Sequence, residues 1–276
     1  MKLTAVLLLL TRWAAAWVPP QRRARATSLS MGWGDPPVWS EATIASNDEA
    51  CEGHRAVTLE VPDETAAAFE TPGQYVQLTL GEEKPGFYAI ASPPGGKQLE
   101  FLIKENEGNA YLTSLKAGSA LKCSEVSGKG YQSKEHFGGD GGAVASQYDG
   151  FACMNVLFVA GGSGIAPIRS CIEGGVAAGL PRPATLYYGA RDPAAAAYAD
   201  KHAMWKKEFN VDVKPCYSQA DGGAYRGYVQ DAMASFGVEV PRNTGACVCG
   251  PKDMFVAVKE LLMGKGVFET RILSNF

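Results

Sequence analysis

Val156-Leu-Phe-Val-Ala-Gly-Gly-Ser-Gly-Ile-Ala-Pro-Ile-Arg-Ser170 is the stretch from which the fold can be worked out. Residues 155–160 form a short apolar run rich in β-branched and aromatic side chains, which predicts a buried strand. Gly161, Gly162 and Gly164 interrupt this run, and helical spacing of apolar residues follows. Such a strand–glycine–helix unit can hold phosphate, because the backbone approaches the anion and the helix N–H groups point at it. A tight turn without a ligand would carry the same glycines, so the motif alone is weak.

The strand-then-helix pattern repeats along the second half of the chain and predicts a doubly wound α/β domain with a parallel sheet. The predicted strands are 155–160, 184–189, 211–217 and 245–249, and the predicted helices are 164–176, 195–209, 228–235 and 252–263. Ligands of such sheets bind outside the carboxyl ends of the strands. We therefore expect the functional residues of this half at the strand ends.

The first half of the chain has the pattern of an antiparallel β-barrel, because short strands are separated by turns with Pro, Gly and Asp. The predicted strands are 56–61, 75–80, 87–91, 99–104 and 120–126, with one short helix at 110–116. The resulting domain boundaries are a linker at 32–50, the barrel at 51–127, a mobile glycine-rich loop and hinge at 128–150, and the α/β domain at 151–276.

Residues 1–31 have the composition of a targeting presequence. The apolar segment 3–11 and the small residues Ala14-Ala15-Ala16 are typical of a secretory signal too short to span a membrane. A segment with three arginines and no acidic residue follows, as in transit peptides. This order resembles the two-part plastid presequence of algae with secondary plastids and implies a plastid stroma, with secretion as the alternative. We expect no transmembrane segment in the mature chain.

Charge and cysteine usage exclude several classes of function. Residues 1–31 hold five of the 26 basic residues and none of the 29 acidic ones, so the remaining chain has a net charge of −8. An acidic chain of this kind disfavours nucleic acid as a partner. The seven cysteines form no Cys-x-x-Cys pair, and no spacing suits zinc or an iron–sulfur cluster, so we predict no metal. A reducing compartment fits these thiols.

Four motifs occur in an order that resembles the ferredoxin–NADP reductase family of flavoenzymes, over about residues 52–276. They are Phe87-Tyr-Ala-Ile-Ala-Ser92, Gly161-Gly-Ser-Gly164, Gly189-Ala-Arg-Asp192 and Cys249-Gly-Pro-Lys252. The phrase from Ala89 onward is most similar to chloroplast FAD/NAD(P)-binding oxidoreductase-like proteins. The resemblance implies an FAD-binding barrel of the ferredoxin-reductase type, followed by an NAD(P)-binding domain.

The resemblance also implies roles for individual residues. Tyr88 would lie against the flavin ring, Arg191 would bind the phosphates of the dinucleotide, and Ser218 would contact a 2′-phosphate. Ser163 and Cys249 would lie nearest the hydride transfer and are the predicted catalytic residues. The predicted cofactor-binding residues are Tyr88, Ala89, Ile90, Ala91, Ser92, Gly108, Asn109, Gly161, Gly162, Gly164, Ile165, Ala166, Pro167, Arg191, Ser218, Arg226, Tyr228, Gly250, Pro251 and Phe276.

The sequence departs from the family pattern at the flavin motif. Gly86 and Ala89 stand where the family has an arginine for the FAD pyrophosphate and a serine near flavin N5. Lys84, Lys129 or the N–H groups around residues 108–110 could replace the arginine, and FMN stays open as an alternative to FAD.

The nucleotide motif departs as well. Gln219 replaces the arginine that usually follows the 2′-phosphate serine, and Arg226 could compensate. The choice between NADPH and NADH is therefore open, with a preference for NADPH.

These observations predict a flavin-dependent oxidoreductase that takes hydride from NAD(P)H and passes electrons to an unidentified acceptor, which could be ferredoxin, a quinone or a small molecule. One alternative is a free-flavin or quinone reductase, because docking of an acidic ferredoxin needs a basic face. Another is a flavin-poor binding or regulatory module on the same fold. No acid–base triad is apparent, and we expect His54, His136 and His202 to be surface residues.

Overall fold

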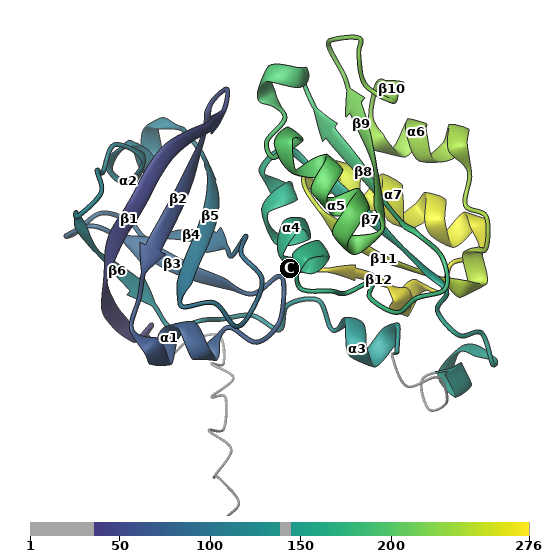
Figure 1. The fold of residues 1–276 in the computed structure, drawn as a ribbon, viewed down its shortest axis with the longest axis horizontal. Helices are drawn as coiled ribbons and strands as arrows, with labels where there is room; N and C mark the ends of the chain where they lie inside the picture. The colour runs from purple at the N-terminus through teal and green to yellow at the C-terminus, as the bar shows by residue number, and fades with distance from the viewer. Residues whose placement is uncertain (1–35, 139–144, 276) are drawn as a thin grey trace, which may run out of the picture.

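The computed structural model describes residues 36–138 and 145–275, which form two domains side by side (Figure 1). The predicted presequence, 1–31, lies outside the described residues. The order of elements matches the expectation, with an antiparallel β-barrel domain first and a parallel α/β domain second.

The barrel domain is a six-stranded antiparallel sheet in the order β4-β3-β6-β1-β2-β5. Its strands are β1 (Trp39–Cys51), β2 (His54–Glu60), β3 (Tyr75–Thr79), β4 (Gly86–Ala89), β5 (Gln98–Lys104) and β6 (Ala120–Ser124), and its helices are α1 (Asp63–Ala68) and α2 (Ala110–Thr113). Alternate residues point inward from every long strand, as Val57 and Leu59 do from β2, and form one apolar core.

The predicted linker at 32–50 is wrong from Trp39 onward, because β1 begins there and is the longest strand described. Ala42 and Ile44 point into the barrel core, which is the alternation expected of a strand. The polar run Asn47-Asp-Glu49 interrupts the alternation of apolar and polar residues. The sequence pattern therefore does not indicate that the strand continues through the second half of β1. Backbone pairing with β2 stabilises that half instead.

The α/β domain is a six-stranded parallel sheet in the order β10-β9-β8-β7-β11-β12. Its strands are β7 (Asn155–Gly161), β8 (Ala184–Ala190), β9 (Val211–Tyr217), β10 (Tyr225–Arg226), β11 (Thr244–Cys249) and β12 (Ile272–Ser274), and its helices are α4 (Ile165–Glu173), α5 (His202–Phe209), α6 (Val229–Phe236) and α7 (Lys252–Lys265). Val156 and Phe158 of β7 pack in the core that contains α4 and α5, whereas Leu157 and Val159 pack with α6 and α7. The sheet is therefore covered on both faces.

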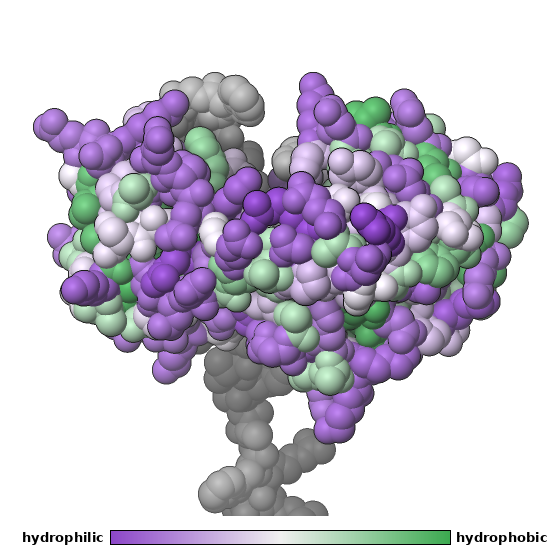
Figure 2. All heavy atoms as spheres, turned by 90° about the horizontal axis from the view of Figure 1, so that it is seen from above, coloured by the Kyte–Doolittle hydropathy of each residue, from purple (hydrophilic) through white to green (hydrophobic). Residues whose placement is uncertain are grey.

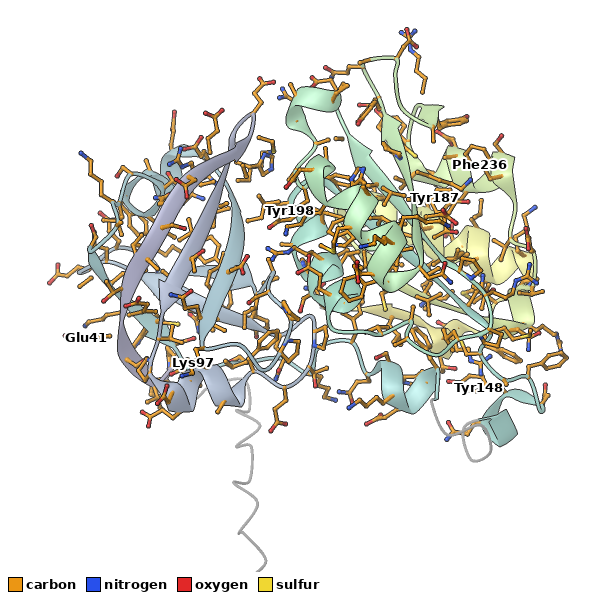
Figure 3. All side chains as sticks on the ribbon, viewed as in Figure 1. Glu41, Lys97, Tyr148, Tyr187, Tyr198 and Phe236 are labelled. Carbon is orange, nitrogen blue, oxygen red and sulfur yellow. The ribbon has the colours of Figure 1, made fainter. Side chains whose placement is uncertain are left out.

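The helix predicted at 195–209 is shorter than expected, because α5 begins only at His202. Tyr198 has a positive φ of 61°, which breaks the helical path. The buried alanines before it make other contacts: the N–H of Ala197 donates to the Tyr188 hydroxyl at 3.0 Å. Tyr198 itself lies on the side of this domain that faces the barrel (Figure 3).

The predicted mobile loop at 128–150 is anchored at both described ends. It contains α3 (Ser133–His136), and the side chains of Tyr131, Phe137 and Tyr148 are buried. Residues 139–144 lie outside the described part of the chain.

Arg271 fixes this segment from the other end of the chain. Its fully buried guanidinium donates to the carbonyl oxygens of His136, Phe151 and Arg242 at 2.8–3.1 Å. The same group lies 3.8 Å from the centre of the Tyr148 ring, an attractive cation–π contact. Arg271 directly precedes β12, so these contacts also hold β12 at the edge of the sheet.

The tip of the β1–β2 hairpin, residues 51–54, joins the two domains. The N–H of Glu52 donates to the carbonyl of Ala194 at 2.9 Å, and the Cys51 thiol lies 3.5 Å from the carbonyl of Ala195. A second link joins Arg169 of α4 to Glu100 of β5. On the face shown in Figure 2, hydrophobic residues are scattered among hydrophilic ones.

No helix within 36–138 or 145–275 is long and apolar enough to cross a membrane.

Candidate functional site

A cavity of about 2080 Å³ lies between the two domains. The barrel contributes β4, the end of β5 and the hairpin tip, and the α/β domain contributes the turns that follow β7, β8, β9 and β11. Small-molecule sites usually measure ~300–1,000 Å³. This cavity is therefore large enough for two extended ligands.

Two glycine-containing turns form the floor of the cavity. They follow β7 and β11, which are neighbours in the sheet with Ala160 paired to Cys249. A Cβ atom on Gly164 would lie 2.4 Å from the Cys249 carbonyl oxygen, so only glycine allows the two turns to touch. Gly162 has a φ of +54°, and a Cβ atom added to it would meet no atom within 4 Å, so its backbone is open to the cavity. A floor of bare backbone beside the N-terminus of α4 suits an anion.

Tyr88 is the main feature of the barrel wall. Its phenol is half-buried, and burial raises the pKa of the hydroxyl, so that it stays neutral at physiological pH. The ring lies over Gly86: a Cβ atom there would be 2.5 Å from the Tyr88 hydroxyl oxygen. A side chain at position 86 would displace the ring, so the glycine allows the phenol to lie flat along the strand.

Cys249 is a neutral thiol at the floor of the cavity. Burial raises the pKa of this thiol to about 12, and a contact with the Tyr131 hydroxyl opposes the rise. The Tyr131 hydroxyl donates to the Val248 carbonyl at 3.2 Å. Cys249 therefore offers a compact, uncharged S–H group rather than a nucleophile or a base.

The far end of the cavity is built from the ends of β8 and β9. Arg191 and Ser218 follow these strands and line the cavity together. Backbone hydrogen bonds hold them side by side, with the Ser218 N–H on the Ala190 carbonyl at 3.1 Å and the Gln219 N–H on the Arg191 carbonyl at 2.8 Å. The Arg191 guanidinium forms a 3.3 Å ion pair with Glu52 of the barrel.

The structure brings most of the predicted site residues to this one cavity. The predicted residues that line it are Tyr88, Ala89, Asn109, Gly161, Gly162, Ser163, Gly164, Ala166, Pro167, Arg191, Ser218, Tyr228, Cys249, Gly250 and Pro251.

Six of the predicted residues do not line the cavity, and Phe276 lies outside the described residues. Ile90, Ala91 and Ile165 are fully buried in the packing of the domains. The Ser92 hydroxyl accepts the N–H of Glu100 at 3.2 Å. Gly108 lies away from the wall, and exposed Arg226 pairs with Asp221 at 3.3 Å.

Three cavity-lining residues carry a polar atom with no hydrogen-bond partner in the described part of the chain, and the sequence analysis did not single them out. They are His54 with Nε2, Gln230 with Oε1 and Asn275 with Oδ1. The expectation of a surface His54 is wrong, since only 8% of this residue is exposed. Its Nδ1 lies 3.1 Å from the Glu52 carbonyl oxygen, so Nδ1 donates to that carbonyl, and Nε2 has no partner among the described residues. No pattern in the sequence around His54 indicates that this residue is buried.

The predictions for the cysteines and for metal can be compared with the described residues. All seven cysteines are free thiols, and all except half-buried Cys51 are buried. Across 36–138 and 145–275, no group of three or more His, Cys, Asp or Glu side chains is arranged to hold a metal ion.

Comparison with protein families and curated proteins identifies relatives. The model of the oxidoreductase NAD-binding domain family matches residues 158–260. The fruit protein pKIWI502 of Actinidia deliciosa is 30% identical over 221 residues, which are 74% of this chain and 66% of that protein. The ferredoxin–NAD(P)+ reductase component of the naphthalene 1,2-dioxygenase/salicylate 5-hydroxylase systems of Ralstonia sp is 26% identical over 82% of this chain and 65% of its own length. The chain thus spans slightly less than two thirds of each relative.

Solved structures share the two-domain fold. The Amycolatopsis cytochrome P450 reductase GcoB has a TM-score of 0.70 and 22% identity, over 87% of this chain and 70% of its own. A ferredoxin–NADP+ reductase from Neisseria gonorrhoeae with bound FAD and NADP has a TM-score of 0.65 and 16% identity, over 86% of this chain and 99% of its own.

Proposed function

We propose that the chain is a member of the ferredoxin–NADP reductase-like family and works as an NAD(P)H-dependent flavoprotein reductase that binds FAD and passes electrons to an acceptor. One observation carries the proposal: a single cavity joins the half-buried phenol of Tyr88 on the barrel to the glycine floor of the parallel sheet. A flavin and a nicotinamide must meet face to face, and both domains contribute residues to the wall of this cavity.

The residues present fit a pyridine dinucleotide at the floor. The open backbone at Gly162 allows close approach of a pyrophosphate, and the N-terminus of α4 favours its negative charge. Gln230, near the start of α6, has a buried side-chain oxygen with no partner among residues 36–138 and 145–275, and a ribose hydroxyl or an amino group of the ligand would satisfy it.

The residues of the barrel fit a flavin. The Tyr88 ring offers a flat aromatic surface for stacking, and the buried Nε2 of His54, which has no partner among the described residues, could hydrogen-bond to a bound nucleotide. The position of the missing family arginine, Gly86, is covered by the Tyr88 ring. Of the two lysines expected to replace its charge, Lys129 lines the cavity and Lys84 does not, so we assign the FAD pyrophosphate to Lys129.

When bound, FAD would accept a hydride from the reduced nicotinamide and release the electrons singly or in pairs. The chain would orient the two rings and exclude water between them. Tyr88 would cover one side of the reaction space, and the turns that carry Ser163 and Cys249 would form its floor. The neutral Cys249 thiol would leave the charge of the site unchanged, as hydride transfer requires no acid or base from the protein.

The electron acceptor in this proposal is ferredoxin, a quinone or a small molecule. The net charge of −8 outside residues 1–31 is the observation that favours the free-flavin or quinone reductase alternative, because an acidic ferredoxin would be repelled by most of such a surface.

The visible spectrum of the purified protein tests the proposal. We expect a flavin band near ~450 nm that bleaches when NADPH or NADH is added without oxygen. A colourless protein that takes up no added FAD would instead support a binding or regulatory module on this fold.

We also propose that the protein is imported into a plastid. The proposal is supported by the order of the signal and the acid-free arginine segment in residues 1–31. A fluorescent fusion of the full chain in an alga with a secondary plastid would be expected in the stroma, and fluorescence in the medium would contradict the proposal.

A further inference from the structure

A carboxylate of the barrel domain reaches the nucleotide edge of the α/β domain. Glu52 lies at the tip of the β1–β2 hairpin, and its Oε1 is 3.3 Å from Nη2 of Arg191. Both residues line the cavity, and both side chains are more than half exposed. Exposed ion pairs of this kind contribute little to stability, so the effect of Glu52 on a ligand comes mainly from the charge that it places beside the ligand.

The two side chains are held opposite each other by fixed backbones. The N–H of Glu52 donates to the Ala194 carbonyl, and the carbonyl of Arg191 accepts the Gln219 N–H. The neighbouring acid, Asp192, is engaged elsewhere, because its Oδ1 accepts the N–H of Ala195 at 3.0 Å. Glu52 is therefore the carboxylate that faces a ligand at Arg191.

The location of the pair identifies the part of the ligand it would meet. The glycine turn follows β7, while Arg191 and Ser218 follow β8 and β9, the next two strands. Adjacent strands are ~4.8 Å apart. A dinucleotide with its pyrophosphate over Gly162 would thus extend its adenosine ribose toward Arg191 and Ser218.

We propose that Glu52 selects the pyridine nucleotide by opposing a 2′-phosphate on the adenosine ribose. The inference rests on the proposed function. In dinucleotide sites a carboxylate accepts a hydrogen bond from the 2′-hydroxyl of NAD, whereas an arginine accommodates the 2′-phosphate of NADP. Here the two groups are paired. NADH can bind with the pair intact, while NADPH must separate Arg191 from Glu52 and place a dianionic phosphate beside a carboxylate.

A second arginine at this edge of the sheet does not compensate for the repulsion between Glu52 and a 2′-phosphate. Arg226, which the sequence suggested as a compensating charge, is paired with Asp221 at 3.3 Å and does not line the cavity. Glu52 therefore shifts the chain away from the NADPH preference expected from the sequence and toward NADH.

Calorimetric titration of the purified full chain with NADP+ and NAD+ tests this selection without turnover. Glu52→Gln removes the charge and keeps the size of the side chain. We expect it to lower the dissociation constant for NADP+ about threefold to tenfold and to change that for NAD+ less than twofold. The fragments 2′,5′-ADP and 5′-AMP should show the same difference, because they contain the adenosine end without the nicotinamide.

Two control variants test whether the effect on nucleotide binding belongs to the Glu52 carboxylate or follows from any loss of negative charge on the hairpin. Glu49→Gln removes an exposed carboxylate from the same hairpin and leaves the Glu52–Arg191 pair in place, so the ratio of the dissociation constants for NADP+ and NAD+ should stay within twofold of wild type. Glu52→Asp retains the charge and should retain the wild-type ratio.

The outcomes distinguish the inference from the proposed function. If the wild type binds both nucleotides and Glu52→Gln leaves their ratio unchanged, or strengthens both equally, the selection by Glu52 is wrong and the reductase proposal stands. If neither the wild type nor Glu52→Gln binds either nucleotide, both are wrong.

Discussion

Arg169 of α4 and Glu100 of β5 are joined by a 2.6 Å ion pair that crosses the boundary between the two domains. Only 7% of the Arg169 side chain is exposed, and its Nε donates to both carboxylate oxygens of Glu173 at 3.0 and 3.1 Å. Burial alone would lower the pKa of this guanidinium, but the hydrogen bonds that it donates to Glu173 and Glu100 raise it. The helix that begins at the glycine turn is thereby tied to the barrel that carries Tyr88.

Replacing the buried partner of this ion pair should be far more damaging than replacing the exposed one. Arg169→Met would leave Glu173 buried and short of its main counter-ion, at a cost of about 3 kcal/mol of unfolding free energy. Glu100→Gln removes a 41% exposed carboxylate and should cost less than about 1 kcal/mol. Thermal melts of both variants compare them, and equal losses would contradict the buried network.

Removal of the Tyr88 ring should weaken flavin binding. We expect Tyr88→Ala to raise the dissociation constant for FAD about tenfold, because an aromatic surface is lost from the cavity wall. Tyr88→Phe keeps that surface and should retain the flavin. Flavin content after gel filtration measures both variants, and full retention by Tyr88→Ala would exclude Tyr88 from the flavin site.

A methyl group at Gly164 should separate the two turns of the cavity floor. Its Cβ would lie 2.4 Å from the Cys249 carbonyl oxygen, so we expect Gly164→Ala to cost about 1–3 kcal/mol of unfolding free energy and to weaken NAD+ binding. Gly264 in α7 is the matched control. No atom lies within 4 Å of its Cβ position, and alanine there should stabilise the helix by up to about 1 kcal/mol. Denaturant unfolding and calorimetry decide between these outcomes.

The Cys249 thiol should resist alkylation at neutral pH. Its pKa of about 12 lies far above that of an ordinary cysteine, ~8.5, so little thiolate is present at pH 8. Because the pKa is higher in the folded chain than in the unfolded one, this thiol stabilises the fold fully below ~pH 8.5, and the contribution is lost progressively as the pH rises to about 12. Mass spectrometry after iodoacetamide treatment at pH 8 should find Cys249 unmodified in the native protein and modified in the denatured one. Rapid native modification would show that the thiol is not protected.

The strands of the parallel sheet could be predicted from sequence, and β7 most directly, because five of its seven residues form a continuous buried apolar run. The predicted range 211–217 matches β9 in full, and 155–160 matches β7 to within one residue. The glycine turn and the ends of β8 and β11 then placed Arg191 and Cys249 at one edge, since parallel strands share that edge.

The remaining features depend on contacts between distant parts of the chain. Alanines 194–197 favour a helix locally, yet two of their carbonyls accept contacts from the hairpin tip, which is more than 140 residues away. The polar half of β1 is held by its pairing with β2, and His54 is buried although its neighbours in sequence are polar. No pattern within a short window contains that information, which is why the Glu52–Arg191 pair was not predicted.

The position of Arg271 has a consequence for the time course of synthesis. Its guanidinium satisfies the carbonyl of His136, which is made 135 residues earlier. At ~5–20 residues per second, that carbonyl waits roughly 7–27 s on the ribosome for its partner. The segment around α3 therefore stays without its buried donor until Arg271 has been synthesised, and slower elongation would lengthen the interval in which a chaperone or a protease can reach it.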